Sequence, residues 1–417
     1  MEEQLKIDFD KIVKGLKLSD ENVKFRRKNL DEFIKSGFPN KRKEEWKFFD
    51  LNQIIKSNIE NLNFFNNYLV PSRKQDSIYI KNFDHNKIVF INGFISTIDL
   101  GHEEQDKIEI EQDLNLTEIN DRSNILVSLN SALLTSYIKL TIKQNYSLNK
   151  PIIIYNTTNK ELNSTAVNLR TDIILEENSS LKLVNLANDE SKNNFININQ
   201  NFKLAKNTIL KNYKIDSVDN SNIKYFFNNI DLDYNSLAET FIFSKASKCI
   251  KNEVNCNLKG EYSSAFINGI IDLEKSNHHE IKTNINHLVK NTKSYQLVKC
   301  VLNDNSKGVY QGKIFVDSKA QKTDGYQLSK ALLLSENTEF DAKPELEIYA
   351  DDVKCSHGST SGNLDEDAIF YLMSRGLNYK QSRELLINGF LLDVVEKITD
   401  QEIKDLIKNI IGIKEWI

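Results

Sequence analysis

Short runs of alternating hydrophobic and polar residues dominate the middle of this chain of 417 residues. From about residue 77 the period is two, which is typical of β-strands because their successive side chains face opposite sides. No helical pattern of comparable strength separates these runs after Leu134. This excludes a doubly wound α/β sheet, because that fold needs a helix between successive strands. The predicted strands are Ser77–Ile80, Lys87–Ile91, Ile138–Ile142, Ile152–Tyr155, Ala166–Leu175, Leu181–Leu186, Phe195–Leu204, Ile209–Ile215, Ile223–Leu232, Ala238–Phe243, Glu253–Leu258 and Ala265–Leu273.

Three all-β architectures fit such a series: a pair of sandwiches, a propeller or a parallel β-helix. A propeller would show a repeating motif of about 40 residues, and the chain shows no such motif. A β-helix tolerates irregular turns, buries apolar side chains inside its tube and places Asn and Ser at its corners. Asn and Ser do recur between the apolar runs, and no proline occurs between Pro151 and Pro344. The pattern therefore favours a parallel β-helix.

Helical periodicity marks the first 70 residues. Ser19 is the expected N-cap of a helix that ends at Gly37. The segment Lys41–Leu51 that follows contains Trp46 and Phe48, which we expect to anchor the N-terminal helices on the β-body.

Helical periodicity returns after Gly362. The pairs Asn378 with Gln381 and Thr399 with Glu402 have the spacing of capping boxes, and Gly412 is expected to end the last helix. We therefore predict three parts: an N-terminal helical region at 1–76, a β-helix core at 77–360 and a C-terminal helical domain at 361–417.

The bulk composition narrows the class of protein. A hydrophobic share of 40% and a charged share of 27% are typical of a folded chain. The net charge of −4 gives no general attraction to nucleic acid or to an anionic membrane. No apolar run reaches the ~18 residues of a membrane span, and the acidic start MEEQLKIDFDKIVKG does not resemble a signal peptide. Four cysteines do not suggest a disulfide framework, so we expect a cytoplasmic protein.

Most residues that could carry chemistry favour a structural role. The run GVYQGKI, Gly308–Ile314, is one residue too short for a phosphate-binding Walker A loop and lacks its Ser or Thr. His278 and His279 are adjacent, so on a strand they face opposite sides and do not readily chelate one ion. His287 alternates with apolar neighbours, as a core histidine does. Buried, inert thiols are expected at Cys249, Cys256 and Cys300.

The segment PELEIYADDVKCSHGSTSG, Pro344–Gly362, is different. Its alternation predicts one strand from Glu345 to His357, which Gly358–Gly362 would end. Residues two apart on a strand share a face, so Cys355 and His357 would lie side by side, their Cα atoms roughly 7 Å apart. Thiolate and imidazole are ligands for iron, iron–sulfur clusters, zinc and copper. One strand supplies at most two ligands, and spacing alone leaves open an exposed histidine beside a half-buried cysteine.

Asp341–Arg375 closely resembles the segment that identifies the SufD type of the SufB/SufD family, the iron–sulfur cluster assembly proteins of the SUF system. Gln321–Ser335, Lys251–Gly260 and Gly37–Leu51 are similar to other segments of that family. The resemblance is strong from about 250 to 397 and patchy through 77–250. Departures are Lys251 in place of Arg, the run His278–Glu280, and Ser359 where Ala is common.

The resemblance implies a right-handed parallel β-helix flanked by helical regions, which agrees with the periodicity. It also implies a non-catalytic scaffold that pairs with a SufB-type paralogue through the β-helix and with the ABC ATPase SufC through the C-terminal helices. His357 matches the family's key histidine, which faces SufB across the heterodimer interface, and Cys355 matches a neighbouring cysteine. Iron or a nascent iron–sulfur cluster would be held there transiently and shared with the partner. No nucleotide is expected on this chain.

Three other interpretations compete with this one. A β-helix could be a polysaccharide lyase or hydrolase, with Asp351 and Asp352 as its carboxylates. A zinc-dependent hydrolase would use His278, His279, His287 and His357. A third possibility keeps the family but replaces the SufB partner by a second copy of this chain.

Overall fold

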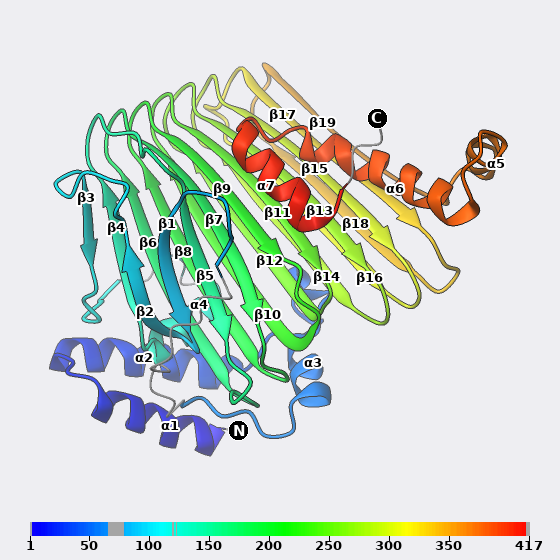
Figure 1. Cartoon of the computed structure of the whole chain (residues 1–417). Helices are drawn as coiled ribbons and strands as arrows, with labels where there is room; N and C mark the ends of the chain where they lie inside the picture. Colours follow the sequence, from blue (N-terminus) through cyan, green and yellow to red (C-terminus); the bar gives the residue numbers. More distant parts are fainter. Residues whose placement is uncertain (1, 66–78, 119–120, 122, 414–417) are drawn as a thin grey trace.

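A computed structural model describes residues 2–65, 79–118, 121 and 123–413. Its body consists of two long sheets in which each strand from β4 onward joins the sheet opposite the one before it, giving a flattened β-solenoid (Figure 1). The ten-stranded sheet has the order β19 (Val353–Gly362), β17 (Thr323–Leu333), β15 (Lys293–Leu302), β13 (Ser264–Leu273), β11 (Leu237–Lys245), β9 (Ile209–Asp216), β7 (Ser180–Asp189), β5 (Ile152–Thr158), β1 (Asn86–Ile91) and β2 (Phe94–Asp99). The nine-stranded sheet has the order β18 (Glu339–Ile348), β16 (Lys307–Val316), β14 (His278–His287), β12 (Ser247–Leu258), β10 (Asn220–Leu232), β8 (Phe195–Leu204), β6 (Ala166–Leu175), β4 (Tyr137–Ile142) and β3 (Ile108–Glu111).

The predicted parallel β-helix, mainly β with helices at both ends, is confirmed. Strands β6 and β8 have the predicted bounds, and β12 begins at Ser247 rather than at Glu253. The pattern did not predict β2, β3 or the run β14 to β17, in which inward polar residues such as Thr283 and Gln296 interrupt the apolar alternation. Of the predicted strand Ser77–Ile80, the first two residues lie outside the described residues, and Tyr79 and Ile80 are not in a strand.

The single strand predicted from Glu345 to His357 is wrong. β18 ends at Ile348, a turn follows, and β19 begins at Val353 in the other sheet. The prediction that Gly358–Gly362 end the strand is also wrong, because β19 continues through Gly362. Its last residues stay extended because they pair in register with β17 as far as Leu332.

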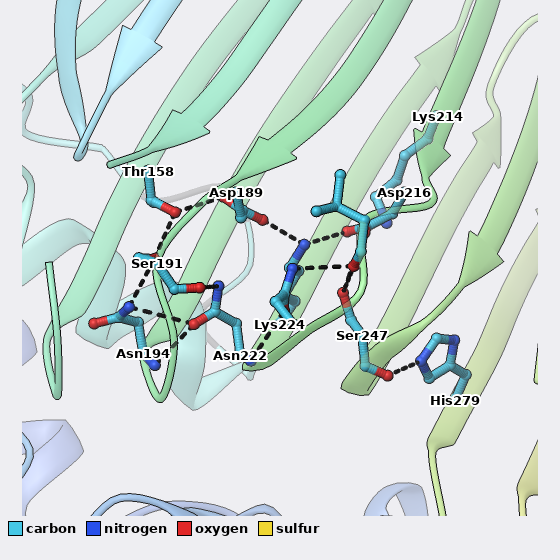
Figure 2. Close-up of polar contacts among 12 residues, drawn as sticks. Thr158, Asp189, Ser191, Asn194, Lys214, Asp216, Asn222, Lys224, Ser247 and His279 are labelled. Atoms are coloured by element: carbon cyan, nitrogen blue, oxygen red, sulfur yellow. Dashed lines mark hydrogen bonds and ion pairs between the residues drawn. The ribbon is translucent and has the colours of Figure 1, made fainter. Parts of the chain in front are cut away.

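In-register parallel pairing stacks equivalent residues, so each strand turns one face into the solenoid. Apolar side chains fill most of the space between the sheets, among them Ile88, Leu140, Leu183, Phe202, Ile230, Ile250, Ile271, Ile285 and Leu302. One corner of this interior holds charges. Lys224 Nζ lies 2.5 Å from Asp189 Oδ2 and 2.7 Å from Asp216 Oδ2, and Ser247 links Asp216 to His279 (Figure 2). Lys224 thus has two carboxylate partners, whereas the neighbouring Lys214 donates to the amide oxygen of Asn252.

A second corner is built on a repeat. A residue at positive φ followed by Ser or Thr recurs at intervals of roughly 30 residues, at Asn178, Asn207, Asn235, Tyr262, Asn291 and Lys322. The hydroxyl after each donates to the carbonyl oxygen three residues earlier, as Thr208 does to Ala205 at 2.8 Å. The asparagines also bond to each other, Asn207 Nδ2 to Asn178 Oδ1 at 3.0 Å and Asn235 Nδ2 to Asn207 Oδ1 at 2.9 Å. Asn is suited to this role because it tolerates the left-handed conformation.

The N-terminal helices cover the outer face of the nine-stranded sheet (Figure 1). They are α1 (Glu2–Gly15), α2 (Asp20–Ser36), the short 3-10 helix η1 (Glu44–Trp46), α3 (Leu51–Asn58) and α4 (Ile125–Leu133). Ser19 caps α2 as predicted, and Gly37 follows it at φ 64°. The predicted anchor is also present, because Trp46 is buried with its ring 5.6 Å from that of Tyr225 on β10. Phe48 is half-buried, and Phe49 is the second buried anchor.

The C-terminal helices α6 (Tyr379–Val395) and α7 (Gln401–Ile411) pack on the outer face of the ten-stranded sheet. The capping box at Asn378 and Gln381 is confirmed. The predicted N-cap Thr399 is wrong, because Asp400 caps α7. Thr399 bonds instead to Glu239 of β11. The Glu239 carboxylate accepts from the Thr399 hydroxyl at 2.6 Å and from the Thr399 backbone N–H at 3.2 Å. In the described part of the chain, no helix is long and apolar enough to cross a membrane.

Candidate functional site

In the part of the chain that the structure describes, the solenoid ends on two long strands that each pair with one neighbour. β18 pairs with β16 and β19 pairs with β17, and the sheet orders end there. Each of these edge strands has 10 residues, whereas the edge strands at the other end, β2 and β3, have 6 and 4. Most of β19 is exposed. A long exposed edge strand presents unpaired backbone groups to which another strand can bind.

Cys355 and His357 both lie on the inward face of β19. In register they pair with Gly325 and Gln327 of β17. A Cβ atom placed on Gly325 would lie 3.4 Å from Cys355 Sγ, so the thiol projects over the inward side of β17. Two residues beyond His357, the hydroxyl of Ser359 accepts from that of Ser329 at 2.9 Å, which places this side chain on the same face. The predicted side-by-side arrangement therefore holds, although the strand begins and ends elsewhere than expected.

The environments of the thiol and the imidazole differ. Cys355 is half-buried and packs against an apolar cluster that contains Ile314 and Val316. Burial raises the pKa of its thiol, and the nearby carboxylate of Asp324 adds to that rise. His357 is exposed, because no further strand covers the end of the ten-stranded sheet in the described residues. The imidazole is thus the more accessible of the two candidate ligands in the free chain.

The other histidines of the zinc-hydrolase interpretation lie on β14 of the nine-stranded sheet, apart from this site. His279 and His287 are both fully buried and bonded, His279 to Ser244 and Ser247, and His287 to Thr292 and Ser294. Burial lowers the pKa of each to about 4. His278 faces the other way, as predicted from adjacency, and its ring lies 4.8 Å from that of Phe49. Within the described ranges, no group of three or more His, Cys, Asp or Glu residues could hold a metal ion.

The remaining predicted residues have structural places. Cys249, Cys256 and Cys300 are free and buried, and burial raises the pKa of Cys249 and Cys256 to about 12. Gly308–Ile314 lies inside β16, where its backbone is paired in the sheet rather than free to bind phosphate. Asp351 and Asp352 lie exposed in the turn between β18 and β19.

A second exposed feature follows β19 directly. Helix α5 (Glu366–Ser374) projects away from the body (Figure 1). Within this helix only Ile369 is buried. Phe370 is 73% exposed, Tyr371 57% and Met373 43%. Large apolar side chains at such exposure are typical of a surface that binds another molecule.

Comparison with known proteins identifies the family. The model of the SufBD core domain, described as SUF system FeS cluster assembly, matches residues 155–390. The chain belongs to the SufBD family. The match includes β19, α5 and both candidate ligands.

Individual relatives extend the similarity to most of the chain. The iron–sulfur cluster assembly protein SufD of Escherichia coli is 25% identical over 93% of this chain and 91% of its own length. The protein of the same name from Bacillus subtilis is 33% identical over 31% of this chain and 30% of its own length. The chloroplastic protein ABCI7 of Arabidopsis thaliana is 41% identical over 28% of this chain and 25% of its own length. The predicted resemblance to the SufD type is thereby confirmed.

Proposed function

We propose that this chain is a non-catalytic scaffold subunit of the SUF system, built as an N-terminal helical region (1–76), a β-helix core (77–360) and a C-terminal helical domain (361–417). It pairs with a SufB-type paralogue through the edges of β18 and β19. His357 binds iron or the nascent cluster at that interface, with Cys355 as a possible second ligand. The cluster is cargo that passes to apoproteins.

The observation that carries this proposal is the exposed His357 on the inward face of an edge strand. A second solenoid whose own edge strands pair with β18 and β19 would cover the open end and bring further ligands toward the imidazole. Such a partner is needed, because one strand supplies at most two ligands and a closed tetrahedral site needs four.

Helix α5 is the proposed docking site for the ATPase SufC. Its aromatic side chains are exposed, whereas α6 is fixed on the ten-stranded sheet. Only residues 363–365 separate α5 from β19, so a movement of α5 acts directly on the strand that carries His357. This arrangement supports a scaffold whose interface responds to nucleotide bound by its partner rather than by this chain.

The experiment replaces His357 by Ala in the native complex. We expect the variant to fold and to co-purify with its partners, yet to fail to support cluster assembly in a complementation assay. His102→Ala is the matched control, because His102 is also exposed but lies in a turn at the far end of the solenoid. Full complementation by His357→Ala would contradict the ligand role. The same tagged chain is also purified anaerobically with its bound partners. If only a second copy of this chain is recovered with it, the homodimer is favoured instead.

A further inference from the structure

We propose that Gln327 is a positioning residue for His357: its side-chain amide, held from inside the solenoid by Tyr310, fixes the orientation of the imidazole. The idea rests on the proposed function, since it concerns how the proposed ligand is presented.

A column of stacked residues leads through the interior to His357. In register along the ten-stranded sheet, Ile267 pairs with Gln296, Gln296 with Gln327, and Gln327 with His357. Farther from the open end the same column runs from Ile267 through Thr240 and Asn212 to Leu183. Gln296 and Gln327 are 0% and 2% exposed. Burying amides costs free energy unless they are bonded, so these two side chains need hydrogen-bond partners inside the solenoid.

These amides belong to one hydrogen-bonded network. The hydroxyl of the fully buried Tyr310 lies 3.2 Å from Gln296 Oε1 and 3.3 Å from Gln327 Oε1. Thr283 donates to the same Gln296 oxygen at 2.5 Å. On its other side Gln327 donates to the carbonyl oxygen of Glu345 on β18 at 3.2 Å. The Gln327 side chain is therefore held between both sheets, at the last layer before the imidazole.

A glycine leaves the room that this network needs. A Cβ atom on Gly312 of β16 would lie 2.1 Å from Gln327 Oε1 and 2.4 Å from Tyr310 Oη. Any other residue there would push both groups away. Glycine at position 312 therefore leaves space for the contact between the Tyr310 hydroxyl and the Gln327 amide.

The geometry explains what a fixed Gln327 does for its neighbour. Paired strands lie about 4.8 Å apart, so the Gln327 amide is the adjacent group against which the His357 imidazole packs. A histidine that binds a metal works best when second-layer groups fix its ring orientation and tautomer. If the Gln327 side chain were mobile, the exposed imidazole would lose that orientation and would bind iron or the nascent cluster less tightly.

The test reads the imidazole directly in the full chain. Histidines labelled with ¹⁵N give long-range ¹H–¹⁵N signals for the ring nitrogens of all 6 histidines, and the signals lost in His357→Gln identify His357. Gln327→Met keeps the volume but removes the amide, and Tyr310→Phe removes only the hydroxyl. We expect both to shift the His357 signals, with the signals of the other five unchanged.

Tyr213→Phe is the matched control. It removes another buried hydroxyl, which donates to Glu239 at 3.1 Å on the outer side of the sheet. We expect His357 signals like those of the unmodified chain. Unchanged His357 signals in folded Tyr310→Phe would overturn the positioning role, and so would an equal shift in the control. The outcome is independent of cluster assembly, so a failure of His357→Ala in complementation and a failure of this proposal are told apart.

Discussion

Lys299 on β15 donates from its ammonium group to the carbonyl oxygen of Phe390 on α6 at 2.7 Å. The same Nζ lies 4.4 Å from the centre of the Phe390 ring and 2.8 Å from Asp393. The Lys299 side chain is 5% exposed. This buried cation therefore helps to fix α6 on the sheet, whereas α5 projects away from the body.

Replacing Lys299 by Met should loosen α6 without unfolding the solenoid. We expect the free energy of unfolding to fall by about 1.5–3 kcal/mol, the usual contribution of a hydrogen bond to a charged group. Hydrogen exchange measured by mass spectrometry should show faster exchange in α6 and unchanged exchange in β5 to β13. Lys293→Met, an exposed lysine on the same strand, is the control. Unchanged exchange in α6 would show that its apolar contacts alone hold it.

Acid should destabilise the chain through buried histidines. His279 and His287 have pKa values lowered by burial from 6.5 to about 4. Between these values the unfolded chain binds protons that the native chain does not, so stability falls as the pH falls from 6.5 to 4. Each histidine contributes on the order of 3 kcal/mol over that range. Chemical denaturation at several pH values should show that the free energy of unfolding depends less on pH in His279→Gln and His287→Gln than in the unmodified chain. His102→Gln should show the same pH dependence as the unmodified chain.

Lys214 should give a pH dependence on the alkaline side. Its Nζ is fully buried over the ring of Phe226, and burial lowers its pKa from 10.5 to about 7. The unfolded chain keeps this proton up to its ordinary pKa, so stability rises from pH 7 toward 10.5, by on the order of 4 kcal/mol for a site buried this completely. Lys214→Met removes this titration. A variant whose stability rises as steeply as that of the unmodified chain would contradict the assignment.

The stacked asparagines Asn178, Asn207 and Asn235, called here the asparagine ladder, should stabilise the chain mainly because asparagine tolerates a positive φ. Asn207 has φ 58° and bonds on both sides within the ladder. Asn207→Ala should lower the free energy of unfolding by about 1–2 kcal/mol, because alanine is strained at positive φ. Asn207→Gly loses the same side-chain bonds without that strain, so it should cost less. Equal losses measured by urea denaturation would mean that the bonds, not the backbone, decide.

The hydrophobic pattern predicted the strands of the solenoid body as far as β13 and missed those from β14 to β17. In β6 and β8 most inward residues are apolar, with Thr171 and Gln200 as the polar exceptions, and the predicted bounds hold. In β14 to β17 the inward residues His279, Thr283, Gln296 and Gln327 disguise the pattern, because their burial depends on partners that are distant in sequence. The corner repeat of a left-handed residue followed by Ser or Thr was a usable signal that periodicity of hydrophobicity does not detect.

The candidate ligands were predictable, but their surroundings were not. Alternation alone placed Cys355 and His357 on one face. It could not reveal that the turn at Asp351 moves them into the other sheet, nor that the chain leaves β19 as an edge. Both facts depend on pairing with β17, which is about 30 residues earlier and is not encoded in any local pattern.

The central claim is that the open end formed by β18 and β19 is the interface of a heterodimer. The most direct measurement compares hydrogen exchange of the isolated chain with that of the complex purified anaerobically from its native cells. We predict that amides in β18 and β19 become protected in the complex, while those of β2, at the edge of the other end, do not change. Exchange in β19 that is as fast in the complex as in the isolated chain would contradict the account.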